Sequence, residues 1–391
     1  MKTLDDFKLK GKRVLIRLDL NSSIINNKVE LSMRFKEHAK TIIELVKKQA
    51  KIVILAHQGK KGEKEYLESL EQHSKILSKL IKKDIIYVDD LFGNKAINAI
   101  KNLKDSQILM LKNTRSWDDE TKNLTSEEHS KSEFIQRLSP YFNLFIQDAL
   151  SVCHRSHASV VGFAYVLPSC VGRVLQKELE NVEKINQKLQ RPFTLILGGV
   201  KIEDYFGIMD KYIGNRQVDN ILTTGAVCLI GAIAKGIRLG KEEEFLEKKD
   251  LMKQVPKLRA YLDKIELPVD FAIDVNNKRK EILVKDLPSD YSILDIGAKT
   301  IKEYVKIIKK SKTIFIKGSS GNYEKPGFEK GTKVLLEEIG KSKAFSLVGG
   351  GDTTTAIEKY KIKNLKNISL SGGALLEYLA GKKLPGIEVL K

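Results

Sequence analysis

Cationic and polar side chains follow a series of short apolar runs in the first half of the chain. These segments are Arg17-Leu18-Asp19-Leu20-Asn21, His57-Gln58-Gly59-Lys60, Lys112-Asn113-Thr114-Arg115, Gln147-Asp148 and Cys153-His154-Arg155-Ser156-His157. Guanidinium and ammonium groups bind carboxylates and phosphates through charge-assisted hydrogen bonds. The pattern therefore predicts a site for a small polyanion. The structural alternative is that Asp19 and Asn21 cap a turn and that Arg115 pairs with Asp118 or Asp119.

Glycines take the corresponding positions in the second half. The segments are Leu197-Gly198-Gly199-Val200-Lys201, Thr223-Thr224-Gly225, Lys317-Gly318-Ser319-Ser320-Gly321, Val348-Gly349-Gly350-Gly351-Asp352-Thr353 and Ser371-Gly372-Gly373-Ala374. Glycine allows the backbone to approach a phosphate closely, and a following helix offers free N–H groups. A single glycine pair is compatible with a tight turn alone, but several together favour a nucleotide phosphate chain. The signatures of P-loop and dinucleotide sites are both absent.

Other chemistries have weaker support. Cys153, His154 and His157 lack a fourth ligand at a suitable spacing for a metal. No Gly-x-Ser-x-Gly elbow indicates a serine hydrolase. One half binding a phosphorylated anion and the other a nucleotide points to phosphoryl transfer.

The elements that must position these groups alternate along the chain. Runs rich in β-branched residues predict buried strands at Val14–Leu20, Ile52–Ala56, Ile85–Val88, Ile108–Leu111, Leu144–Gln147, Thr194–Leu197, Asn220–Thr223, Tyr291–Leu294, Thr313–Ile316, Phe345–Val348 and Asn367–Leu370. Amphipathic stretches between them, such as Tyr66–Lys83, predict helices. This alternation is typical of α/β folds with parallel sheets, whose ligands bind beyond the carboxyl ends of the strands.

The chain has 391 residues, which at ~150 residues per domain suggests two or three domains. A helical stretch at Leu175–Leu189 lies near the midpoint, where we expect the junction. No apolar run approaches the ~18 residues of a membrane span, and the N-terminal residues show no signal peptide. Three cysteines without a paired pattern favour a reducing cytosol.

The formal charge of +19 has two explanations: a nucleic-acid surface, or a lysine-rich surface on an enzyme for anionic substrates. A nucleic-acid site needs aromatic platforms among the basic residues. Aromatic residues make up only 7% of the chain and are not interleaved with basic runs, so no nucleic-acid partner is expected.

The chain resembles the phosphoglycerate kinases along nearly its whole length. The matching segments occur in family order: Arg17-Leu18-Asp19-Leu20-Asn21, Arg34, Ala56-His57-Gln58-Gly59-Lys60, Lys112-Asn113-Thr114-Arg115, Asp148-Ala149 with His154-Arg155-Ser156-His157, Gly198-Gly199-Val200-Lys201, Leu267-Pro268-Val269-Asp270, Asp295-Ile296-Gly297, Gly349-Gly350-Gly351-Asp352-Thr353 and Leu384-Pro385-Gly386. The segments around Val161–Gly172 and Thr223–Lys235 are similar to archaeal members.

The resemblance implies an α/β fold of two Rossmann-like domains with parallel sheets, joined by a hinge helix. It implies a phosphoglycerate-binding domain at 1–173, an interdomain helix at 174–190, a nucleotide-binding domain at 191–373 and a returning segment at 374–391. The implied activity is reversible phosphoryl transfer between ATP and 3-phosphoglycerate, giving ADP and 1,3-bisphosphoglycerate. Magnesium would accompany the nucleotide. A cytoplasmic monomer without membrane contact is expected.

The resemblance also implies roles for individual residues. Phosphoglycerate would contact Asp19, Asn21, Arg34, His57, Lys60, Arg115 and Arg155. The nucleotide would contact Gly198, Gly199, Lys201, Gly225, Lys317, Glu324, Gly350, Gly351, Asp352 and Thr353, with Asp352 as the magnesium ligand and Glu324 on the ribose. The catalytic set would be Arg34, Lys201, Gly350 and Gly373.

Some positions depart from the family pattern. Lys60 replaces an arginine, Tyr205 stands where many members carry a second lysine, and Lys317, Ser319 and Ser371 replace an asparagine, a proline and a glycine. A slow or re-purposed member acting on another acyl phosphate is the alternative reading. Lys201 and Tyr205 would lie four residues apart on a helix beginning after Gly199. We expect Lys317 either to restore the missing charge beside the nucleotide or to point into solvent.

Overall fold

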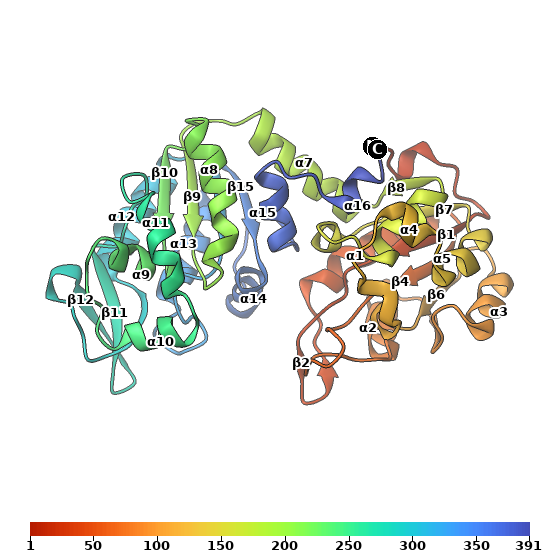
Figure 1. The fold of residues 1–391 in the computed structure, drawn as a ribbon, viewed down its shortest axis with the longest axis horizontal. Coiled ribbons are helices and arrows are strands. Elements are labelled where there is room, and N and C mark those ends of the chain that lie inside the picture. The colour runs from red at the N-terminus through yellow and green to blue at the C-terminus, as the bar shows by residue number, and fades with distance from the viewer. The chain divides into compact units, whose positions relative to one another are not determined.

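The computed structural model describes residues 1–391 and separates into two compact units (Figure 1). The first comprises Met1–Glu180 together with Lys382–Lys391, and the second comprises Asn181–Gly381. The chain passes from one unit to the other within helix α7, Arg173–Gln187. Each unit is an α/β structure with its own parallel sheet.

A six-stranded parallel sheet forms the centre of the first unit, in the order β5-β6-β4-β1-β7-β8. Its strands are β1 Arg13–Arg17, β4 Lys51–Leu55, β5 Ile85–Val88, β6 Ile108–Leu111, β7 Leu144–Gln147 and β8 Ser169–Val171. The central strands are apolar on both faces because helices cover both sides of the sheet. The sequence pattern predicted five of these strands and missed β8. A small hairpin of β2 Ile24–Ile25 and β3 Lys28–Val29 completes the strands of this unit.

The helices of the first unit connect successive strands. They are α1 Met33–Lys47, α2 Glu71–Ile81, α3 Asn94–Asn102, α4 Ser126–Ser130, α5 Glu133–Leu138, α6 Phe163–Val166 and the first part of α7. Helix α1 illustrates why these segments are helical. Its apolar residues recur at helical spacing and are buried in the core of the first unit: Phe35, Ala39, Ile42 and Leu45.

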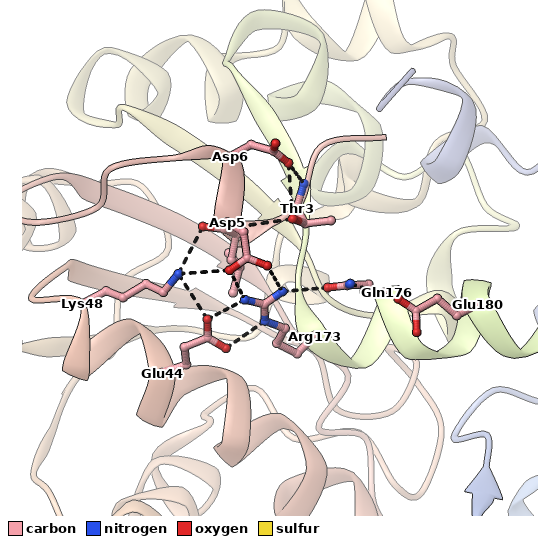
Figure 2. Close-up of polar contacts among 9 residues, drawn as sticks. Thr3, Asp5, Asp6, Glu44, Lys48, Arg173, Gln176 and Glu180 are labelled. Carbon is pink, nitrogen blue, oxygen red and sulfur yellow. Dashed lines mark hydrogen bonds and ion pairs between the residues drawn. The ribbon is translucent and has the colours of Figure 1, made fainter.

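The start of α7 is tied to the first unit by an ionic cluster around Arg173 (Figure 2). The Arg173 guanidinium donates to both carboxylate oxygens of Glu44 at 2.7 and 2.8 Å and to both of Asp5 at 2.6 and 2.8 Å. Lys48 lies 3.3 Å from Glu44. These contacts lower the pKa of Asp5 to about 2, chiefly through the hydrogen bonds from Arg173. One side chain thus joins the N-terminal segment, α1 and α7.

The second unit contains a five-stranded parallel sheet in the order β10-β9-β14-β15-β16. Its strands are β9 Phe193–Leu197, β10 Asn220–Thr223, β14 Thr313–Lys317, β15 Phe345–Gly349 and β16 Asn367–Ile368. The predicted strand at Tyr291–Leu294 does not join this sheet. It corresponds to β13 Ile293–Ile296, which pairs antiparallel with β11 Asp270–Val275 in a separate sheet that also holds β12 Lys278–Leu283.

Eight helices accompany the two sheets of the second unit. They are α8 Phe206–Gly214, α9 Gly225–Ala234, α10 Glu242–Lys248, α11 Val255–Arg259, α12 Ala298–Lys310, α13 Lys330–Lys341, α14 Gly351–Tyr360 and α15 Gly373–Leu379. Helix α9 is apolar around its whole circumference and is almost completely buried. No helix in the molecule combines the length and apolar character that crossing a bilayer requires.

Residues Lys382–Lys391 return to the first unit and end in α16, Pro385–Glu388. Figure 1 shows this last segment, in blue, beside the red and yellow elements. The Gly386 amide donates to the Cys153 carbonyl at 2.9 Å. A Cβ atom on Gly386 would lie 2.7 Å from Val160 and 2.9 Å from the Cys153 backbone, so only glycine fits this approach. The final ten residues are therefore part of the first unit's packing.

Candidate active site

The predicted anion-binding residues gather at one edge of the first unit's sheet. Asp19 follows β1, His57 follows β4, Arg115 follows β6, and Arg155 follows β7. The strands are parallel, so their carboxyl ends meet at the same edge. The structure thus brings together residues that lie up to 136 positions apart in the chain.

Arg17 and His57 form the buried base of this cluster. The Arg17 guanidinium is 1% exposed, donates to the Ser159 hydroxyl at 2.9 Å and lies 3.1 Å from His57 Nδ1. Burial lowers the pKa of Arg17 to about 10. Burial also lowers the pKa of His57 well below its usual value, and nearby arginines add to the effect. His57 is therefore neutral at pH 7, and its Nδ1 can accept a hydrogen bond from the Arg17 guanidinium.

Behind Arg17 lies a carboxylate that sequence reasoning missed. Glu120 is fully buried and accepts hydrogen bonds from the Ser159 amide at 2.9 Å and the Ser159 hydroxyl at 2.5 Å. The Ser159 hydroxyl in turn accepts a hydrogen bond from Arg17. No sequence signal marked Glu120, because it occurs in the acidic run Asp118-Asp119-Glu120 that reads as surface.

Asp19 connects Arg34 to the loop after β1. The Asp19 carboxylate pairs with Arg34 and accepts the Ser151 hydroxyl, and its other oxygen accepts the Asn21 amide at 3.1 Å. The turn-capping reading of Asp19 is thus correct as far as it goes, but the side chain also holds Arg34. Asn21 accepts the Gly59 amide at 2.7 Å. Burial lowers the pKa of Arg34 to about 10.

Arg115, Arg155 and Lys60 provide positive charge and form no ion pair with a carboxylate. Arg115 donates to the Gly59 carbonyl at 2.6 Å, and its buried Nε has no hydrogen-bond partner. Arg155 and Lys60 are exposed. The expected alternative pairing of Arg115 with Asp118 or Asp119 is wrong. Those carboxylates pair with lysines, Asp118 with Lys61 at 2.5 Å and Asp119 with Lys122 at 2.7 Å.

In the second unit, glycine turns at neighbouring strand ends pack directly against one another. The Gly199 amide donates to the Ser319 carbonyl at 2.8 Å, and the Gly225 amide donates to the Ser320 carbonyl at 2.9 Å. Gly318 has a φ of +87°, and a Cβ there would overlap the Gly198 carbonyl. Glycine is required here for the close approach of the turns after β9 and β14.

The start of α14 offers backbone N–H groups to an anion. Gly350, at φ +99°, precedes the helix, and no side chain caps it. The exposed residues Gly351 and Asp352 form its first turn. The Thr353 hydroxyl is buried and accepts the Gly318 amide at 2.9 Å, so it joins α14 to the turn after β14. Uncapped N–H groups and the helix dipole together favour a phosphate at this end.

A cavity of about 310 Å³ opens beside the glycine turns of the second unit. Gly199, Gly225 and Ser319–Gly321 form one side. Its apolar walls come from Ala226, Leu229, Phe245, Phe271 and Ile293. A flat aromatic ring is the natural occupant of such walls.

One buried carboxyl group lines the cavity from the start of α10. Glu242 accepts the Ile293 amide at 2.9 Å, and burial raises its pKa to about 7. The sequence did not single out Glu242, because it begins the run Glu242-Glu243-Glu244, which reads as an exposed helix start.

Lys317 is buried in this region and does not point into solvent. It is 6% exposed, its Nζ lies 3.2 Å from Asp204, and it sits 4.9 Å from the centre of the Tyr205 ring. Burial lowers the pKa of Lys317, while Asp204 acts in the opposite direction. The solvent-exposed reading of Lys317 is therefore wrong.

Lys201 and Tyr205 do not share a helix face as expected. Residues Ile202–Tyr205 form a short 3₁₀ turn, and α8 begins only at Phe206. Lys201 is exposed, whereas Tyr205 is buried and donates its hydroxyl to the carbonyls of Gly198 and Lys317 at 2.6 and 3.1 Å. Tyr205 thus fastens the two glycine turns together.

Glu324 and Gly373 complete the predicted nucleotide residues. Glu324 lies exposed in a turn, and its carbonyl accepts Lys359 at 3.3 Å. Gly373 begins α15, and no atom would obstruct a Cβ there. Both positions leave room for a ligand.

The protein has no cluster of three or more metal-ligating side chains. A magnesium ion would therefore rely on one carboxylate together with phosphate oxygens and water, which suits its preference for oxygen ligands and retained water. Asp352 fits this role, because it is exposed and has no hydrogen-bond or ion-pair partner in the structure.

Comparisons with known proteins show similarity to one family along nearly the whole chain. The family model described as "Phosphoglycerate kinase" matches residues 4–382. The phosphoglycerate kinases of Methanobacterium bryantii and Pyrococcus furiosus are each 38% identical to this chain over 99% of its length, covering 96% and 97% of theirs.

Solved structures give the same result. A crystal structure of phosphoglycerate kinase from Pyrococcus horikoshii OT3 matches with a TM-score of 0.96 at 36% identity, covering 100% of this chain and 98% of that one. The enzyme from Coxiella burnetii matches with a TM-score of 0.77 at 28% identity, with the same coverage.

Proposed function

Because this chain belongs to the phosphoglycerate kinase family, we propose that it catalyses reversible phosphoryl transfer between ATP and 3-phosphoglycerate. The products are ADP and 1,3-bisphosphoglycerate. The acceptor is a carboxylate, which is already ionised at neutral pH. The reaction therefore needs no general base, and catalysis consists of positioning and charge neutralisation.

The observation that carries the proposal is the set of cations left without carboxylate partners at the sheet edge of the first unit. Arg115, Arg155 and Lys60 form no ion pair, and Arg115 Nε is buried without a hydrogen bond. An unpaired guanidinium in a buried setting is costly unless a ligand supplies the missing charge. The phosphate of phosphoglycerate supplies it. Asp19, Asn21 and His57 then contact the polar remainder of the substrate.

The second unit supplies the nucleotide site in this proposal. The purine ring occupies the apolar cavity beside Gly199 and Gly225, and Glu324 contacts the ribose. The phosphates meet the N–H groups of Gly350, Gly351 and Gly373, with Gly198 and Thr353 shaping the turns around them. Magnesium bound at Asp352 would neutralise part of the phosphate charge. Lys201, exposed at the turn after β9, and Arg34 then flank the transferring phosphoryl group.

A coupled assay with ATP, magnesium and 3-phosphoglycerate tests the proposal. We expect turnover that depends on both substrates. A family member re-purposed for another acyl phosphate would bind nucleotide but give no product with 3-phosphoglycerate. If no product forms at saturating concentrations of both substrates, the assignment of 3-phosphoglycerate as the acceptor is overturned.

The three cysteines are free and buried, which is typical of proteins in a reducing compartment. We accordingly propose that the enzyme acts in the cytoplasm, and we also propose that it acts as a monomer.

A further inference from the structure

A buried hydrogen-bond chain runs from the anion site to the first turn of α7. The Asp19 amide donates to His38 Nε2 at 3.3 Å, and His38 Nδ1 lies 3.0 Å from Asp148 Oδ2. The other Asp148 oxygen accepts the Val174 amide at 2.8 Å and the Leu175 amide at 3.4 Å. All members lie in the first unit, and the side chains of His38 and Asp148 are 1% and 0% exposed.

The hydrogen bonds fix the tautomer of His38. A backbone amide can only donate, so Nε2 must carry a lone pair toward Asp19. The proton of the neutral ring is then on Nδ1, where it is donated to the Asp148 carboxylate. His38 is thus held as the Nδ1–H tautomer by its two neighbours.

Asp148 replaces a helix cap that α7 lacks in its own sequence. The first N–H groups of a helix have no partner within the helix, and a carboxylate there is stabilised by the helix dipole. Gly172 leaves room for this contact, because a Cβ at that position would overlap Asp148 Oδ1. Any shift of Asp148 must therefore change the hydrogen bonds of the Val174 and Leu175 amides in the first turn of α7.

Helix α1 connects both ends of this arrangement. Arg34 and His38 are four residues apart and lie on the same helix face, and Arg34 pairs with the Asp19 carboxylate. Further along α1, Glu44 binds Arg173, the first residue of α7 (Figure 2). Asp19 is thus held through its carboxylate by Arg34 and through its amide by His38.

We propose that His38, as the Nδ1–H tautomer, is a positioning residue that orients Asp19 for phosphoglycerate and links the occupied anion site to the first turn of α7 through Asp148. This role rests on the proposed function, since it takes phosphoglycerate as the ligand. His38 touches no substrate; it acts through Asp19 on one side and Asp148 on the other.

Two variants of His38 separate its hydrogen bond to Asp19 from its hydrogen bond to Asp148. The amide of glutamine reaches the place of Nε2, so His38→Gln keeps an acceptor for Asp19 and loses the donor to Asp148. The amide of asparagine reaches the place of Nδ1, so His38→Asn keeps the donor to Asp148 and loses the acceptor. We expect His38→Asn to raise the KM for 3-phosphoglycerate about 2–10-fold with a smaller change in kcat, the effect of one hydrogen bond. His38→Gln should leave KM within about twofold.

The link to α7 is measured by amide hydrogen exchange. In the wild-type protein, 3-phosphoglycerate should slow exchange at Val174 and Leu175 by about fivefold or more. His38→Gln should bind the ligand without this added protection. His129→Gln is the matched control, because His129 is also buried in the first unit but its ring hydrogen-bonds only to the carbonyls of Lys122 and Ser156. The His129→Gln variant should keep the ligand-induced slowing of exchange at Val174 and Leu175 even if the substitution lowers the stability of the protein.

The tautomer is tested without ligand or substitution, by ¹⁵N NMR of the histidine rings. A His38 signal with the proton on Nε2 would overturn the inference. Phosphoglycerate binding with unchanged exchange at Val174 and Leu175 would overturn the link while leaving the proposed function intact. Failure of 3-phosphoglycerate to bind at all would instead overturn the proposed function, and the positioning role with it.

Discussion

Asp19 shows how many tasks one buried carboxylate performs in this protein. It pairs with Arg34, accepts the Ser151 hydroxyl and the Asn21 amide, and offers its own amide to His38. Removing the Asp19 charge would remove the ion pair with Arg34 and would weaken the contacts of the loop after β1 at the same time. Substitutions at the partners of Asp19 therefore test each role separately.

Arg34 is the first such partner. Arg34→Ala should lower kcat by ~10³ with a smaller change in nucleotide affinity, in the range of a lost arginine that contacts the transferring phosphoryl group. Lys47→Ala, at an exposed position of the same helix, is the control and should retain full activity. Steady-state kinetics decide the matter: near wild-type kcat with only a raised KM for phosphoglycerate would assign Arg34 to plain binding.

Asp352 separates metal binding from helix capping. Gly350 precedes α14 and no side chain caps the helix, so Asp352→Asn should leave the melting temperature nearly unchanged. Activity should fall strongly and recover in part at high magnesium, because asparagine is a weaker ligand without charge. A magnesium titration of this variant measures the effect. Full activity at low magnesium would argue against the metal role.

We predict that Lys317 supplies the nucleotide phosphates with the positive charge that the neutral Tyr205 side chain cannot supply. Lys317→Asn should cost about 1–3 kcal/mol of transition-state stabilisation, the scale of a charged hydrogen bond. Lys312→Asn, at an exposed position just before the opposite end of β14, is the matched control. Unchanged kcat/KM for both substrates in Lys317→Asn would mean that Asp204 merely neutralises a structural lysine.

At the residue scale, the sequence predicted the groups that carry a recognisable spacing and missed those that support them. His57 and Arg115 follow strands and could be found. Glu120 and His38 could not, because their partners, Ser159 and Asp148, lie 39 and 110 positions away. Only the folded chain shows that these charged or polar side chains are buried.

At the scale of elements, parallel strands were the most predictable feature. β5, β6, β7 and β10 have the predicted bounds, because each is a short apolar run between polar turns. The antiparallel pair β11 and β12 was missed. Strand β12, Lys278–Leu283, is mostly polar and lies at a sheet edge, so its hydrophobic pattern is weak. Tertiary pairing makes it a strand.

The Arg173 cluster gives a prediction about the start of α7. Arg173→Met should lower the melting temperature by about 2–4 °C at pH 7, because Asp5 and Glu44 lose their shared cation. The pKa of Asp5 is about 2 when folded against an ordinary 3.8, so its contribution is present above the ordinary value and is lost as pH falls toward 2. The difference between the two proteins should therefore shrink over that interval.

Calorimetry across this pH range measures the effect. Arg137→Met, which breaks an exposed pair with Glu133, serves as the control and should change little. A difference that stays constant down to pH 2 would attribute the loss to packing of the side chain rather than to its charge.

At the scale of the whole molecule, the proposed anion site and the proposed nucleotide site belong to different compact units. Phosphoryl transfer requires both substrates to meet with water excluded. We predict that small-angle scattering shows compaction when ATP and 3-phosphoglycerate are both present, and little with either alone. Identical profiles in all states would remove closure, and α7 as its hinge, from the mechanism.

The charge of +19 has a local counterpart in the first unit, where several cations surround His57. Composition alone could not distinguish this arrangement from a nucleic-acid surface. The distinction depends on where the cations lie. Arg17 and Arg115 are turned inward at the ends of strands, which suits a small anion better than a polymer.

The return of residues 382–391 to the first unit has a consequence for synthesis. Residues 181–381 are synthesised before residues 382–391, so the first unit still lacks α16 while the second unit is being made. Until then, the surface around Val160 and Cys153 that receives Gly386 is uncovered. The first unit therefore cannot complete its packing until the second unit has been synthesised, although all six strands of its own parallel sheet are made before residue 181.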